Sequence, residues 1–159
     1  MKQNYWVGII VSFVVVLLQS CEGKDVAYEK TYTFEKNLLT KNEHVRFEFE
    51  NTADTFQLYN VVLSVVHEPA VPTYQLPLVL GYHSPNGESV SVPIAIPLYG
   101  NGFKTVGTMR SDSLVELQQT LFYANSFRKG VNTFELALDS HQDSLFGIVS
   151  FSLSIERAN

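Results

Sequence analysis

Apolar and polar residues alternate with a period of two along much of this 159-residue chain. Val45, Phe47 and Phe49 alternate with charged neighbours, which predicts a strand with one buried face. Residues 56–66 are apolar on both faces for most of their length. They predict a central strand that is covered from both sides.

Similar alternation predicts strands in several other segments, which are residues 26–35, 74–82, 88–96, 131–138 and 145–155. Residues 111–123 fit two structures. Ser113 and Glu116 have the spacing of a capping box, which would open a short helix. The apolar positions also fit a strand, and we favour the strand because the neighbouring segments are strands.

Proline and glycine mark the turns and one long loop. Pro77 cannot donate a hydrogen bond to a ladder, so we expect the strand Tyr74–Tyr82 to lie at a sheet edge or to contain a bulge. The segment Ser84-Pro85-Asn86-Gly87 has the composition of a hairpin turn. Residues 97–110 contain three glycines and form the longest predicted loop, where binding residues tend to concentrate.

These elements together predict the fold class. About eight strands with short turns and at most one short helix indicate an all-β, antiparallel β-sandwich, with the jelly roll as its candidate topology. We expect it to form a single domain over residues 28–159, because that length closes one hydrophobic core.

The first residues have the pattern of an export signal. Lys2 precedes an apolar run over residues 5–18, and Ser20 stands before Cys21, which is the only cysteine of the chain. The order resembles a bacterial lipoprotein signal. We therefore predict a signal peptide at 1–20, lipidation of Cys21 and a short tether at 21–27. An ordinary secretory peptide or a short membrane anchor is the alternative.

Charge and missing motifs narrow the function. Lys2 is the only ionised side chain in 1–20, so the remaining chain has 10 basic and 16 acidic residues and a net charge of about −6. An acidic domain repels phosphate backbones, which argues against nucleic acid as a partner. The sequence has no zinc-protease, nucleophile-elbow, phosphate-loop or paired-cysteine motif. We expect neither an enzyme nor a cofactor.

Two segments that contain histidine are candidate metal sites. His67 has no second histidine at the spacing of zinc proteases, and we interpret it as the end of a strand. Asp139, His141 and Asp143 occupy alternate positions and would present three ligands on one face of an extended segment. Their surroundings also have ordinary turn composition, which is the interpretation we favour.

Aromatic residues provide the candidate contact surface. They either form a sugar-binding platform or fill the core of a sandwich that lacks disulfides, and the residues concerned are Tyr74, Tyr82, Tyr99, Phe103, Phe122 and Tyr123. Tyr99 and Phe103 lie in the glycine-rich loop, so we expect these two to be exposed. Tyr74, Tyr82, Tyr99 and Phe103 are the predicted partner or ligand contacts.

Several short segments in chain order resemble one known family. They are Val45–Phe49, Tyr59–Leu63, Ser84–Glu88, Leu98 with the glycines of 100–107, Phe127–Gly130 with Phe134, and Leu145–Ile148 running to Glu156. With the lipoprotein signal, they are similar to the GldH family of gliding-motility lipoproteins of Bacteroidetes. Phe103 stands where that family usually has a tryptophan.

The resemblance implies a cell-envelope protein without catalytic residues. It would be an accessory component of the gliding machinery, linked to type IX secretion, with its membrane contact through lipidated Cys21. We expect it to bind protein partners through a loop cluster or through an unpaired sheet edge such as Tyr74–Tyr82. The alternative is a glycan-binding lipoprotein that uses Tyr99 and Phe103.

Overall fold

The computed structural model describes residues 24–111 and 113–158. It is an all-β protein of eleven strands in antiparallel sheets, and the described part contains no α-helix. The predicted signal peptide and Cys21 lie outside the described residues. The first strand begins at Val26, so the last two residues of the predicted tether already belong to a sheet.

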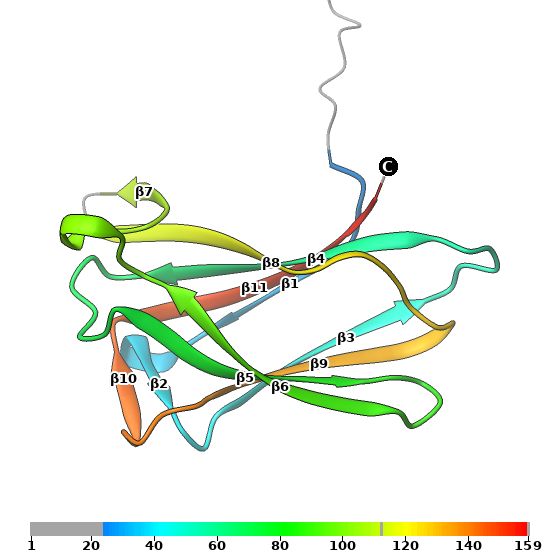
Figure 1. The fold of residues 1–159 in the computed structure, drawn as a ribbon, viewed down its shortest axis with the longest axis horizontal. Helices are drawn as coiled ribbons and strands as arrows, with labels where there is room; N and C mark the ends of the chain where they lie inside the picture. Colours follow the sequence, from blue (N-terminus) through cyan, green and yellow to red (C-terminus); the bar gives the residue numbers. More distant parts are fainter. Residues whose placement is uncertain (1–23, 112, 159) are drawn as a thin grey trace, which may run out of the picture.

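Two larger sheets stack face to face (Figure 1). The five-stranded sheet has the order β1 (Val26–Thr33), β11 (Ile148–Arg157), β4 (Leu58–His67), β8 (Leu114–Ser126) and β7 (Thr108–Ser111). The four-stranded sheet has the order β3 (His44–Asn51), β9 (Gly130–Leu138), β5 (Gln75–His83) and β6 (Ser89–Pro97). The prediction of an antiparallel sandwich is confirmed.

A small two-stranded sheet closes one end of the stack. It consists of β2 (Leu38–Thr40) and β10 (Ser144–Phe146), and two short 3₁₀ turns, η1 (Glu35–Asn37) and η2 (Asn101–Phe103), complete the fold. Three of the eleven strands, β2, β7 and β10, have only three or four residues. The remaining eight are longer, and the total of eleven in the described residues exceeds the roughly eight strands that the alternating pattern predicted.

The core lies between the two large sheets and follows the predicted alternation. Val45, Phe47 and Phe49 are buried, while the residues between them are exposed. Phe134 and Phe151 are fully buried with Phe47, and each such side chain stabilises the fold by about 1.5–3 kcal/mol. Without a second cysteine, this burial has to hold the domain together.

The segment that is apolar on both faces is the central strand of its sheet, as predicted. β4 pairs with β11 on one side and with β8 on the other. Its outward side chains Val62, Ser64 and Val66 are also buried. Long side chains of the same sheet flank them, and Glu116 accepts a hydrogen bond from the Ser64 hydroxyl at 2.6 Å. Residues 114–126 form a strand rather than a helix, which confirms our preference.

The strand around Pro77 is not a sheet edge, so the prediction for Tyr74–Tyr82 is wrong. β5 pairs with β6 on one side and with β9 on the other. The Pro77 carbonyl accepts a hydrogen bond from the Asp139 N–H at 3.0 Å, so the missing N–H of Pro77 also faces β9. Since β9 ends at Leu138, that missing donor falls beyond the paired part of the ladder.

One edge of this sheet is β6, whose prolines protect it, and the other edge is β3. The Leu98 N–H donates to the Tyr74 carbonyl at 3.0 Å, so the even-numbered residues of β6 bond to β5 and the odd-numbered ones face outward. Pro93 and Pro97 are odd-numbered and offer no donor at the free edge. Strand addition by a partner is therefore disfavoured at β6.

The turn that joins β5 to β6 is the predicted hairpin. The Ser84 N–H donates to the Glu88 carbonyl at 2.8 Å, and the Gly87 N–H donates to the Ser84 carbonyl at 3.0 Å. Gly87 has a φ of +88°, a conformation that side chains rarely adopt. The Ser-Pro-Asn-Gly composition thus gives the turn that its chemistry favours.

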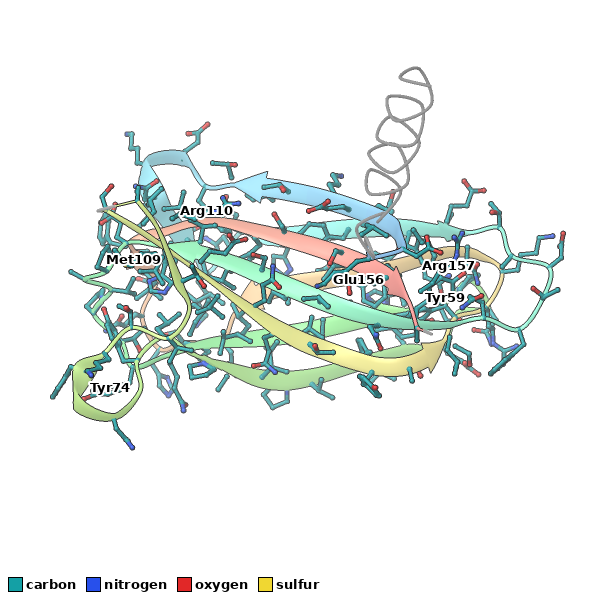
Figure 2. The ribbon with its side chains drawn as sticks, turned by 90° about the horizontal axis from the view of Figure 1, so that it is seen from above. Tyr59, Tyr74, Met109, Arg110, Glu156 and Arg157 are labelled. Atoms are coloured by element: carbon teal, nitrogen blue, oxygen red, sulfur yellow. The ribbon has the colours of Figure 1, made fainter. Side chains whose placement is uncertain are left out.

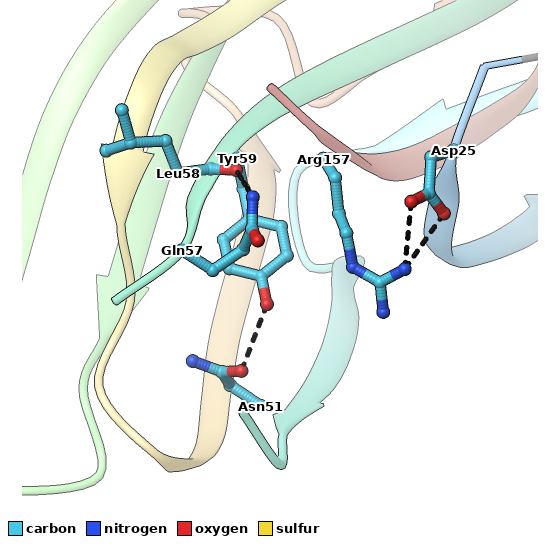
Figure 3. A network of polar contacts seen from close by, with 6 residues as sticks. All are labelled: Asp25, Asn51, Gln57, Leu58, Tyr59 and Arg157. Atoms are coloured by element: carbon cyan, nitrogen blue, oxygen red, sulfur yellow. Dashed lines mark hydrogen bonds and ion pairs between the residues drawn. The ribbon is translucent and has the colours of Figure 1, made fainter. Parts of the chain in front are cut away.

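The sandwich has two distinct ends. At the entry end, where the described chain begins, Asp25, Arg157, Tyr59 and Asn125 lie side by side at the ends of neighbouring strands. Arg157 forms an ion pair with Asp25 at 2.9 Å, and the Tyr59 hydroxyl donates to Asn51 at 3.2 Å (Figure 3). The opposite end, called the far end below, bears β2, β7, β10 and η2 (Figure 1).

His67 ends β4, as predicted, and its imidazole is fully buried. Its Nδ1 lies 2.7 Å from the Glu68 carbonyl, which can only accept, so Nδ1 carries the proton. The buried Nε2 has no hydrogen-bond partner in the described residues. Burial lowers the pKa of His67 below its ordinary value of 6.5, because a charged imidazolium would be desolvated there.

This burial predicts an acid-sensitive fold. Below about pH 6.5 the unfolded chain binds a proton at His67 that the folded chain does not, so the free energy of unfolding should fall by at most about 1.4 kcal/mol per pH unit. Denaturant titrations between pH 8 and pH 5.5 measure this slope. His67→Gln should flatten it, and His83→Gln, at an exposed site, should not. An unchanged slope in His67→Gln would assign the acid sensitivity to other groups.

Candidate functional site

Three of the four predicted contact residues meet at the far end of the sandwich. The rings of Tyr74 and Phe103 have centroids 5.2 Å apart, and those of Tyr74 and Tyr99 are 5.9 Å apart. We call Tyr74, Tyr99 and Phe103 the surface aromatic cluster. Phe103 is 74% exposed and Tyr74 is 51% exposed, so their rings are available to a partner.

The loop that carries Phe103 is held by backbone hydrogen bonds. The Gly100 N–H donates to the Lys104 carbonyl at 2.8 Å, and the Val106 N–H donates to the Leu98 carbonyl at 2.9 Å. These bonds form a narrow extension beyond β6 with η2 at its tip. The glycine-rich segment is therefore an ordered support rather than an open loop.

Gly107 allows this extension to return close to the sheet. Its φ is +114°, and a Cβ at this position would lie 2.3 Å from the Glu116 carbonyl oxygen. Any other residue would push the segment away from β8. Gly107 thus helps to set the position of the surface aromatic cluster relative to β8.

Tyr99 supports the cluster from below. Its hydroxyl accepts a hydrogen bond from the Val71 N–H at 2.9 Å and lies 2.6 Å from the Pro69 carbonyl, to which it donates. The ring is half-buried, in contrast to the exposure we expected. Tyr99 therefore ties the connection between β4 and β5 to the loop, and Tyr74 and Phe103 carry the exposed surface.

Phe103 has an unusual backbone. Its φ is +59°, the left-handed region that bulky residues rarely occupy. A large apolar side chain that is exposed and also held in an unfavourable conformation contributes little to folding. Such positions are typical of functional sites.

Tyr82 does not belong to this surface. It lies in β5, its ring centroid is 5.3 Å from that of Phe134, and its hydroxyl donates to Asn132 at 2.8 Å. Burial raises the pKa of Tyr82 above its ordinary value. Phe122 and Phe127 pack around it, so Tyr82 is half-buried against the core, apart from the other three residues that we predicted as contacts.

The histidine and aspartate segment lies in an exposed turn. Asp139, His141 and Asp143 are all exposed in the connection between β9 and β10. The Gln142 N–H donates to the Ser140 hydroxyl at 3.0 Å, a bond typical of turns. Over residues 24–111 and 113–158, no group of three metal-ligating side chains is placed to hold an ion.

Other exposed apolar side chains escaped the sequence interpretation. Met109 of β7 and Phe146 of β10 are 51% and 63% exposed at the far end. Figure 2 shows Met109 at the same end as Tyr74, with Glu156 and Arg157 toward the other end. An alternating pattern cannot show that a short strand leaves its apolar residue uncovered, so no sequence signal singled them out.

Comparisons with known proteins assign no family. No family model matches the chain, and no curated protein is similar to it. The resemblance to the GldH family remains a prediction from the sequence segments given above. Within the described residues, no helix is long and apolar enough to cross a membrane.

The conformation of Phe103 predicts that its exposed ring can be removed without loss of stability. Phe103→Gly removes a left-handed aromatic residue, whose conformation costs about 1–2 kcal/mol, but adds chain entropy to the unfolded state. The free energy of unfolding should stay unchanged or rise by up to about 1 kcal/mol. Denaturant melts should show lower stability for Phe56→Gly, because exposed Phe56 has a negative φ. Equal losses in both variants would contradict this account.

Proposed function

We propose that this protein is a non-enzymatic, lipid-anchored component of the bacterial cell envelope that acts by binding another protein. It would be a GldH-type accessory component of the gliding machinery, linked to type IX secretion. The apolar run that ends at Cys21 supports the anchor, and the segments similar to the GldH family support the assignment.

The separation of the two ends is the observation that carries this proposal. The described chain begins at the entry end, where Lys24 pairs with Glu156 at 3.0 Å. Tyr74 lies toward the opposite end of the sandwich (Figure 2). A lipid on Cys21 would therefore hold the entry end and leave the surface aromatic cluster pointing away from the bilayer.

The chemistry of the cluster favours recognition over catalysis. Tyr74 and Phe103 offer apolar ring faces and one free hydroxyl group, and Tyr99 uses its hydroxyl within the fold. Aromatic side chains on a rigid support are typical anchors of protein interfaces. Because prolines protect the β6 edge, the loop surface is a better partner site than that edge.

The second candidate is a glycan-binding lipoprotein. The exposed Tyr74 and Phe103 rings favour it, since aromatic faces stack on sugar rings. Their planes are tilted by 50° and do not form one flat platform. Because Tyr99 is half-buried, a sugar would be held by Tyr74 and Phe103 rather than by the predicted pair.

The anchor is tested by Cys21→Ala in cells. The variant should leave the membrane fraction while the purified domain keeps the melting temperature of the unmodified fold, because the substitution precedes the first strand, which begins at Val26. Ser20→Ala keeps a small residue before the cysteine and should stay in membranes. Membrane fractionation of Cys21→Ala unchanged from that of Ser20→Ala would contradict the anchor.

The contact surface is tested by co-purification from detergent-solubilised envelopes. Phe103→Ser with Tyr74→Ser should lose a partner that the unmodified protein retains by at least about tenfold, a loss typical of removing a central aromatic contact. Val131→Ser alters another exposed apolar residue and serves as the control. A glycan array separates the two candidates. Saturable sugar binding that the double variant loses would reject the protein-binding proposal.

A further inference from the structure

Two aromatic side chains at the entry end of the sandwich are the most exposed large apolar residues in the described chain. Tyr123 is 82% exposed and Phe56 is 80% exposed. Phe56 lies in the connection between β3 and β4, and Tyr123 lies near the end of β8. Neither ring contributes to the core, and neither belongs to the surface aromatic cluster.

The strand register places both rings near the start of the described chain. Arg157 lies beside Asp25 and pairs with Tyr59, which in turn pairs with Asn125. Neighbouring strands are about 4.8 Å apart, so this row extends on the order of 15 Å from Asp25. Phe56 and Tyr123 are three and two residues away from the row. They therefore belong to the same end as Lys24.

The length of the intervening chain limits how far this end can stand from a lipid on Cys21. Two residues separate Cys21 from Lys24, and the three fully extended Cα–Cα steps between them span at most about 11 Å. The entry end would then be held within a distance comparable to the headgroup layer on one side of a bilayer. A long spacer that would lift the domain clear of the surface is absent from this stretch.

We propose that the entry end rests on the bilayer with Phe56 and Tyr123 inserted among the lipid headgroups. The inference rests on the proposed lipidation of Cys21. Phenylalanine is apolar, and tyrosine combines an apolar ring with a hydroxyl that suits the boundary between lipid and water. The two rings would fix the orientation of the domain, which attachment at a single point cannot do.

The charges at the entry end favour insertion of the two rings into the bilayer over electrostatic attraction to lipid headgroups. Lys24 pairs with Glu156, Arg157 pairs with Asp25, and a third ion pair joins Lys129 to Asp54. These paired charges leave little net positive charge to attract anionic headgroups. We therefore expect the contact to be independent of anionic lipid.

Tryptophan fluorescence tests the contact directly. The only tryptophan is Trp6, in the predicted signal peptide, so the processed chain has none. Phe56→Trp and Tyr123→Trp each introduce a single reporter of similar shape. The lipidated proteins are purified from membranes and reconstituted in phosphatidylcholine vesicles with brominated acyl chains. The emission should fall at least about twofold, as expected for a ring buried in the interface. Phe103→Trp, at the far end, is the matched control and should not be quenched.

Vesicle flotation in the same samples separates the anchor from the contact. If the proteins float but the tryptophan is quenched in neither entry-end variant, the proposed ring insertion is wrong and the lipid anchor stands. Proteins that do not float would overturn both. Equal quenching with and without phosphatidylglycerol supports ring insertion. Quenching that requires phosphatidylglycerol, or that is equally strong in Phe103→Trp, would overturn it.

Discussion

Burial of one face of each sheet against the other is the constraint on which this structure depends. The protein has one cysteine, and no disulfide can close the domain, so its stability rests on the apolar layer between the sheets. Phe47 and Phe134 sit opposite each other on β3 and β9, and Phe151 of the other sheet belongs to the same buried cluster. The most exposed aromatic side chains, which are Tyr123, Phe56 and Phe103, lie at the ends of the sandwich instead.

The two ends of the sandwich carry different side chains, and each end has its own proposed contact. The far end places Phe103 on an extension that Tyr99 and Gly107 hold in position, and Tyr74 packs against Phe103 from the connection between β4 and β5. The entry end combines paired charges with two exposed rings close to the proposed lipid. Pro93 and Pro97 remove donors from the β6 edge, which disfavours strand addition at that edge. In this account one end holds the membrane and the other holds the partner.

The alternating pattern was sufficient to predict the sandwich, its central strand and the Ser84–Gly87 turn, because burial of one face imposes a period of two on the sequence. It did not reveal β2 or β7, which are too short to show a period, and it merged β10 with β11 into one strand over residues 145–155. Pro77 led us to predict a sheet edge, because a proline offers no N–H to a neighbouring strand. The sequence cannot show that the neighbouring strand β9 ends before it reaches Pro77. Tyr82 and Phe103 are both aromatic, and only the packing of the strands shows that Tyr82 is half-buried against the core and that Phe103 is exposed.

The account is tested most directly by photocrosslinking in intact cells, with a benzophenone amino acid placed at position 103 or at position 56. If one end binds a partner and the other rests on the membrane, position 103 should give a discrete protein adduct and position 56 should give mainly lipid adducts. Protein adducts from position 56 with lipid adducts from position 103, or the same products from both positions, would contradict the account.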